Sequence, residues 1–217
     1  ICQRYESLMG LFMLLSFYGL VRAQDPAHAR LWTDVALASC ALGMATKEIM
    51  IVAPVLLLAY DALFLSAGVR DAMAKRWRTH LAFISTWGVF LVLGAAYRAY
   101  EVTSGSTLGL SEDPGRYLLT QAGVVLYYIR LAIIPYPFCL DYDWPLVARY
   151  RDAIPQVLGV LALIGLTAWA CRRRLAVGFL GLWFFLILAP SSSIRPLPDV
   201  VFEHRMYLPL AALVVLT

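Results

Sequence analysis

Long apolar runs separated by short polar segments dominate the pattern of this sequence. The runs are apolar all round rather than on one face, which is typical of helices surrounded by lipid or by other helices. A helix needs ~20 residues to cross a bilayer, and several runs are slightly shorter than that. The pattern predicts about seven spans, at Ser7–Val21, Leu31–Thr46, Ile49–Ala67, Leu81–Tyr97, Ile154–Cys171, Leu175–Pro190 and Tyr207–Thr217.

Basic residues give these spans an orientation, because arginine and lysine in short loops mark the cytoplasmic side. Half of the chain's 18 lysine and arginine residues fall in the stretches 22–30, 68–79 and 172–174. We therefore place all three stretches in the cytoplasm. Most of the remaining charges are of mixed sign and are expected on the other side of the membrane, whereas Asp25, Asp34, Asp61 and Asp71 are expected on the cytoplasmic side.

This orientation decides how the ambiguous segment Tyr117–Ile134 is interpreted. Only one full crossing fits between the outer loop that follows Tyr97 and the cytoplasmic arginines at 172–174. The segment also carries Gln121 and Arg130, so we expect an interfacial or re-entrant helix. The alternative is that it crosses normally, which would place the arginines at 172–174 outside.

The composition supports a membrane assignment. Hydrophobic residues make up 61% of the chain and charged residues 15%, whereas soluble domains are roughly 45–50% apolar and about 25% charged. Such a chain cannot cover a water-facing surface with polar groups. Disorder, nucleic-acid binding and a disulfide scaffold are excluded, and the predicted fold class is an all-α polytopic transmembrane helix bundle with the lipid bilayer as a partner. The excess of arginine over lysine indicates a bacterial inner membrane, or the endoplasmic reticulum membrane in a eukaryote.

The two ends of the sequence influence the expected domain organisation. The chain begins without methionine and ends within an apolar run. We therefore expect residues 1–217 to be a single transmembrane domain that is a fragment of a longer protein, truncated at both ends.

Two groups of charged residues flank the early spans on the outer side. Arg4 and Glu6 surround a tyrosine where the first span begins, and Lys47 and Glu48 form a very short turn between two apolar runs. Ionisable residues at membrane depth are often functional, and a lysine there is suited to a phosphate group. The alternative is that all four residues are interfacial anchors.

Two later outer segments combine acids with aromatic or basic residues. Asp141, Asp143 and Trp144 lie in PYPFCLDYDWP, where aromatic rings beside carboxylates are suited to a sugar and the two acids to a divalent ion. Glu203, His204 and Arg205 precede the last span and offer an acid, an imidazole and a phosphate-binding guanidinium. Anchoring and capping are the alternatives for both segments.

Four blocks of the chain together resemble a known family. They are QRYESLMGLFMLLSFYGL, MATKEIMIVAPVLLLAYDALF, YYIRLAIIPYPFCLDYDWP and LAPSSSIRPLPDVVFEHRMYLP. In this order they are similar to the membrane domain of transmembrane and tetratricopeptide-repeat proteins. These are O-mannosyltransferase-like members of the GT-C glycosyltransferase superfamily.

The resemblance implies a GT-C-like helix bundle and an enzyme that uses a polyprenyl-phosphate sugar as its donor. It implies transfer of the sugar, mannose in this family, to protein hydroxyls on the non-cytoplasmic side. The catalytic acids would lie in an outer loop before Ile1 and the tetratricopeptide repeats after the membrane part, so this fragment alone would be inactive. The residues that match the blocks are Arg4, Glu6, Lys47, Glu48, Asp141 to Trp144 and Glu203 to Tyr207.

Two other functions stay open at this point. A non-catalytic membrane scaffold that displays tetratricopeptide repeats would show the same spans. A transporter of a lipid-linked solute would place ionisable groups near the membrane midplane in broken helices, whereas most charges here lie at span ends and in outer loops.

Overall fold

Helices account for all regular secondary structure in the part of the chain that the computed structural model describes. The described residues are 4–104, 113–136, 139, 142, 144–192 and 200–216, without the side chains at 98 and 100–104. Where they are described, the eight apolar segments named above lie largely within one helix or within successive helices. The chain divides into two compact units, Ile1–Leu108 and Gly109–Thr217.

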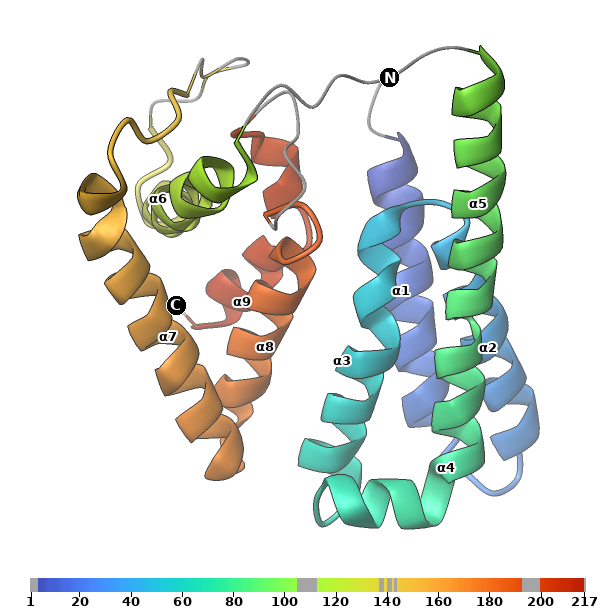
Figure 1. The fold of residues 1–217 in the computed structure, drawn as a ribbon. Helices are drawn as coiled ribbons and strands as arrows, with labels where there is room; N and C mark the ends of the chain where they lie inside the picture. Colours follow the sequence, from blue (N-terminus) through green and yellow to red (C-terminus); the bar gives the residue numbers. More distant parts are fainter. Residues whose placement is uncertain are drawn as a thin grey trace. The chain divides into compact units, whose positions relative to one another are not determined.

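The first unit is built on the antiparallel pair of helices α1 (Arg4–Arg22) and α2 (Ala29–Met44) (Figure 1). Gly19 allows close packing of this pair, because a Cβ atom at this position would lie 2.8 Å from the Cβ of Ala36 and from the carbonyl oxygen of Trp32. Small residues at such contacts let two backbones approach closely. The helices of this unit are α1 (Arg4–Arg22), α2 (Ala29–Met44), the 3-10 turn η1 (Glu48–Val52), α3 (Ala53–Tyr60), the π-helical turn η2 (Asp61–Leu65), α4 (Val69–Ser85) and α5 (Trp87–Ser104).

A kink divides α4 into two parts. Arg76 has non-helical backbone angles (φ −131°, ψ 30°), and the part before it runs across one end of the unit while the part after it leads into α5 (Figure 1). At the kink, Nη2 of Arg76 donates a hydrogen bond to Oε1 of Gln24, 2.7 Å away in the turn between α1 and α2. The basic stretches 22–30 and 68–79 therefore lie at the same end of this unit, as the sequence predicted.

The second unit contains a hairpin of helices α7 (Ile154–Arg172) and α8 (Ala176–Leu188). Helix α6 (Pro114–Ile133) lies across one end of this hairpin. The hairpin turn is tight: Arg174 adopts a left-handed conformation (φ 56°), and the N–H of Leu175 donates to the carbonyl of Ala170, as in a Schellman motif. The helices of this unit are α6 (Pro114–Ile133), the 3-10 turn η3 (Tyr150–Ala153), α7 (Ile154–Arg172), α8 (Ala176–Leu188), the 3-10 turn η4 (Glu203–Met206) and α9 (Pro209–Leu216).

Helix α6 crosses the direction of α7 and α8 (Figure 1). Near its start, the hydroxyl of Tyr117 donates to the carbonyl of Ser191. In its second half, the hydroxyl of Tyr128 donates to the carbonyl of Phe202. Both parts of α6 thus contact the segment between α8 and α9, at the end of this unit opposite the arginines at 172–174.

Among the residues that the structure describes, three helical stretches are long and apolar enough to cross a membrane. They are Glu48–Leu65, Val69–Tyr97 and Tyr150–Arg172, and Ala176–Leu188 is a shorter apolar helix. The first is η1, α3 and η2 in succession, and the second joins α4 to α5. Helix α6 is absent from this set, which fits its content of polar residues. An all-helical membrane protein is therefore the fold that the described residues support.

Candidate functional sites

A buried ion pair joins the first turn of α1 to the turn before η1. Nζ of Lys47 bonds Oε1 of Glu6, and the two side chains are only 10% and 4% exposed. The ammonium also lies 5.3 Å from the ring centre of Tyr5. Each charge therefore compensates the other in a site where an unpaired charge would be strongly unfavourable.

The four candidate residues near the first spans differ in how far their side chains are buried. Glu6 and Lys47 are buried together, which also places the start of α1 and the Lys47 turn at one end of the unit, as the sequence predicted. Arg4 and Glu48 are exposed. Lys47 has an extended backbone, and this conformation lets its side chain extend toward α1.

A second cluster surrounds Glu203 in the other unit. Its Oε1 accepts hydrogen bonds from the hydroxyl of Tyr142 and from the backbone N–H of Cys139, 3.2 Å away. Burial, and then the hydrogen bond to Glu203, raise the pKa of Tyr142 above its ordinary value. The ring of Tyr127 on α6 lies 5.6 Å from that of Tyr142 and 5.1 Å from that of Trp144.

This arrangement brings Glu203 and Trp144, two of the predicted site residues, into one cluster. We name the cluster formed by Tyr127, Tyr142, Trp144 and Glu203 the carboxylate–aromatic cluster. Asp141 and Asp143 lie outside the described residues. Among the described residues, no group of three His, Cys, Asp or Glu side chains is arranged to hold a metal ion.

The two residues that follow Glu203, His204 and Arg205, make contacts within their own segment. The His204 ring lies 4.7 Å from the ring of Phe202. Arg205 is buried, and its Nη1 donates to the carbonyl of Val200 at 3.1 Å. Its guanidinium also lies 5.3 Å from the ring centre of Phe202. Arg205 therefore stabilises the turn before α9 through contacts within the segment.

A cavity of about 230 Å³ opens beside Glu203. Its wall is apolar apart from Glu203 and Tyr128, and α6, the residues that follow it and the start of α9 supply the other lining residues. A carboxylate at the edge of an apolar cavity orients a ligand through hydroxyl groups while the wall contacts its apolar parts.

A third cluster, at the other end of the first unit, was not predicted as a site from the sequence. Oδ2 of Asp61 lies 2.8 Å from Nε2 of His80, and both side chains are almost completely buried. Oδ1 of Asp61 accepts from the hydroxyl of Ser66 at 2.6 Å and from Nη1 of Arg76 at 3.3 Å.

The signal for this cluster in the sequence was weak. Asp61 is a single acid at the end of an apolar run, and His80 follows it after a basic loop. Only the π-helical turn at Asp61–Leu65 and the kink at Arg76 bring them together. Such turns within a helix often occur at functional sites.

No family model, no curated protein and no solved structure matches the chain. The geometry described above and the resemblance of the four sequence blocks are therefore the basis for a function.

Proposed function

We propose that this chain is part of the membrane domain of a GT-C-like glycosyltransferase. In this proposal the protein transfers a sugar, with mannose as the first candidate, from a polyprenyl-phosphate donor to protein hydroxyls on the non-cytoplasmic side. The observation that supports it most is the carboxylate–aromatic cluster, in which Glu203 borders a cavity and is linked to Trp144 through the rings of Tyr142 and Tyr127. Carboxylates bond sugar hydroxyls, and aromatic rings stack on the apolar faces of sugars.

The proposal includes a finer membrane topology. Helix α1 has 19 residues and α2 has 16, which correspond to roughly 29 and 24 Å of helix. Both lengths are near the ~30 Å hydrocarbon core if flanking residues contribute. We infer about seven spans, with α1, α2, α8 and α9 crossing beside the three long stretches. We assign α6 to the interface on the non-cytoplasmic side.

The roles within the proposed site follow from the contacts. Glu203 is the acceptor for a sugar or substrate hydroxyl, Tyr142 orients this carboxylate, and Trp144 is the stacking surface. A donor phosphate would compete with Glu6 for Lys47 and with the carbonyl of Val200 for Arg205. We therefore give these two basic residues structural roles and test the carboxylate–aromatic cluster first.

The test is transfer of radiolabelled mannose from polyprenyl-phosphate mannose to a serine- and threonine-rich peptide by the full-length protein in proteoliposomes. We expect Glu203→Gln to lower kcat/KM by about tenfold or more, because a hydrogen bond to a charged group contributes roughly 1.5–3 kcal/mol. Trp144→Ala is expected to raise KM. The matched control is Asp152→Asn, an exposed acid in η3, with unchanged transfer expected.

The same assay separates the alternatives. Unchanged transfer by Glu203→Gln would remove Glu203 from the site. A wild-type protein that transfers sugar from no lipid-linked donor would favour the membrane scaffold. Movement of the intact lipid-linked donor across the bilayer, without transfer, would favour the transporter.

A further inference from the structure

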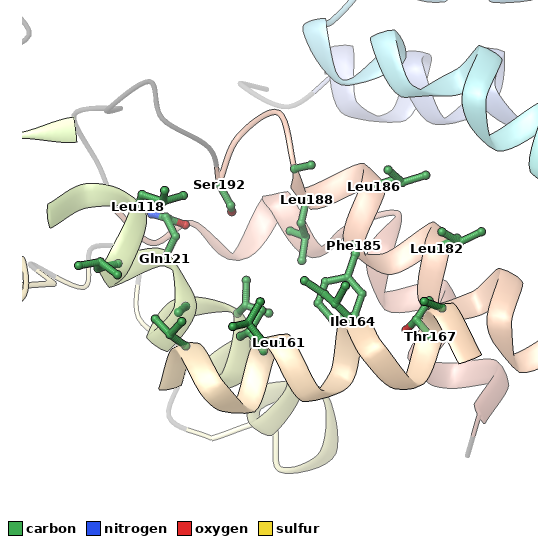
Figure 2. A pocket seen from close by; sticks show the side chains of 17 residues that line it. Leu118, Gln121, Leu161, Ile164, Thr167, Leu182, Phe185, Leu186, Leu188 and Ser192 are labelled. Carbon is green, nitrogen blue, oxygen red and sulfur yellow. The ribbon is translucent and has the colours of Figure 1, made fainter. Parts of the chain in front are cut away.

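A second and larger cavity lies between α6, α7 and α8. It has a volume of about 550 Å³, and aliphatic and aromatic side chains line most of it. Figure 2 shows Gln121 and Ser192 at one end of this groove and Thr167 and Leu182 toward the other. Its lining residues all belong to the second unit, and the contacts of Glu203 described above do not include them.

The end of the groove near Gln121 contains two unsatisfied polar atoms. Gln121 is only 2% exposed, and its Nε2 donates to the carbonyl of Val200 at 3.1 Å. This bond fixes the orientation of the amide, because a carbonyl oxygen accepts only from the nitrogen side. Oε1 of Gln121 and Oγ of Ser192 are buried, and no described group bonds either atom.

These two atoms differ from the third polar side chain of the groove. The hydroxyl of Thr167 donates to the carbonyl of Leu163 at 2.9 Å, and so is satisfied within its own helix. A buried acceptor without a donor is unfavourable by about 1–3 kcal/mol. The unsatisfied groups are therefore confined to one end of the groove, and Oε1 of Gln121 requires a hydrogen-bond donor.

The dimensions and charge of the groove restrict the ligand that would supply this donor. The lining residues of α7 extend from Val157 to Ala168, which is roughly 16 Å of helix and about the depth of one leaflet of a ~30 Å hydrocarbon core. None of the described lining residues carries a charge. A phosphate in this groove would have no cation among them, and phosphate oxygens do not donate to Oε1 of Gln121.

We propose that this groove binds one hydrocarbon chain of a neutral membrane lipid whose head group carries a free hydroxyl. The hydroxyl donates to Oε1 of Gln121 and exchanges a second hydrogen bond with Oγ of Ser192. The chain extends along α7 and α8 toward Thr167. This ligand is distinct from the charged polyprenyl-phosphate donor of the proposed reaction, and its binding does not depend on that reaction.

The test uses the full chain in lipid nanodiscs and a monoacylglycerol that carries a diazirine on its acyl chain. After irradiation, mass spectrometry locates the labelled peptides. We expect labels on α7 and α8 residues of the groove, with labelling at least about threefold above that by the methyl ester of the same diazirine fatty acid, since one net hydrogen bond contributes roughly 1 kcal/mol. We also expect it to exceed labelling by the matching lysophosphatidic acid.

Three variants make the result specific. Ile164→Trp fills the groove and should abolish labelling, whereas Leu158→Trp, an exposed position of α7 outside the lining, should leave it unchanged. Ser192→Ala removes no bond within the described protein and should lower labelling by the alcohol about threefold. Labelling by the methyl ester should stay the same.

Several outcomes would overturn the inference. Equal labelling by the alcohol and the ester would show an apolar surface without head-group recognition. Stronger labelling by lysophosphatidic acid would show a phosphate site. If Ile164→Trp left the labelling intact, the hydrocarbon chain would not be bound in this groove. The same conclusion would follow if no probe labelled the groove residues.

Discussion

Nε2 of His80 in α4 lies 2.8 Å from Oδ2 of Asp61 in the π-helical turn, with both side chains almost fully buried. Ser66 and Arg76 complete the contacts of the carboxylate, and Arg76 also reaches the turn between α1 and α2 through Gln24. Asp61 thus connects the end of the apolar stretch Glu48–Leu65 to the kink at Arg76 in α4. Because the partners come from three segments, this cluster fixes the end of the first unit.

We expect Asp61→Asn to destabilise the protein by about 3 kcal/mol, because it leaves a partly buried guanidinium without its anion. The measurement is the free energy of unfolding in mixed detergent micelles. Asp71→Asn is the control, since Asp71 pairs with Lys75 on the surface and should have no measurable effect. Equal effects of the two substitutions would contradict the assignment.

The buried pair of Glu6 and Lys47 should show strong coupling in a double-mutant cycle. Glu6→Gln or Lys47→Met alone removes the attraction between the two charges while the other stays largely buried, so each should destabilise by about 3 kcal/mol. The double variant should lose less than the sum by about 2 kcal/mol. Additive effects would show that the two charges do not interact. The surface pair of Asp71 and Lys75 provides the uncoupled reference.

Two glycines of the α7–α8 hairpin should respond in opposite directions to alanine. A Cβ at Gly178 would lie 2.6 Å from the backbone nitrogen of Cys171, whereas a Cβ at Gly165 would have no heavy atom within 4 Å. We expect Gly178→Ala to destabilise by about 1–3 kcal/mol through overpacking. Gly165→Ala should stabilise by up to about 1 kcal/mol through helix propensity. Unfolding monitored by circular dichroism measures both, and effects of the same sign would be inconsistent with this packing.

The phenol of Tyr142 should stay protonated at a pH where ordinary tyrosines ionise. Burial and the hydrogen bond to Glu203 raise its pKa, whereas an unperturbed tyrosine has a pKa of about 10. The resulting stabilisation is present below pH ~10 and is lost as pH rises through the folded-state value. The ¹³Cζ shift of Tyr142, assigned with Tyr142→Phe, measures this titration, and Glu203→Gln should lower the pKa. Ionisation near pH 10 in the wild type would contradict the contact.

Both ends of α6 should be accessible from one side of the membrane. In a variant without the native cysteines, we expect Leu118→Cys and Ile133→Cys to react with an impermeant maleimide from the non-cytoplasmic side. Both positions are exposed. Arg173→Cys should react only from the cytoplasmic side. Reaction of the two α6 positions from opposite sides would show that this helix crosses the bilayer.

Much of the helical framework was predictable from the sequence, because hydrophobic runs near the length of a bilayer have few other stable solutions. The basic stretches 22–30 and 68–79 were correctly expected at one end, and the contact between Arg76 and Gln24 confirms it. The common end of Glu6 and Lys47 was also predicted. Their direct pairing was not, since it depends on how α1 packs against the turn before η1.

The contacts of the candidate residues in the second unit also depend on packing between segments. Glu203 and Trp144 meet through Tyr142 and Tyr127, which come from different segments. His204 and Arg205, which follow Glu203 in sequence, contact Phe202 and the carbonyl of Val200 respectively. Successive residues in a 3-10 turn point in different directions, so the sequence alone does not give the partners of each.

The sequence by itself indicated an all-helical membrane protein, because apolar runs near the length of a bilayer satisfy their backbone in lipid as α-helices. It also determined which connections carry the basic charge. Only the tertiary structure decided which polar groups are satisfied and which are not. Asp61 obtains partners through a π-helical turn and a kink, and Oε1 of Gln121 has none among the described residues. Hydropathy records how many polar groups a segment has, whereas their partners depend on side-chain directions that packing between segments fixes.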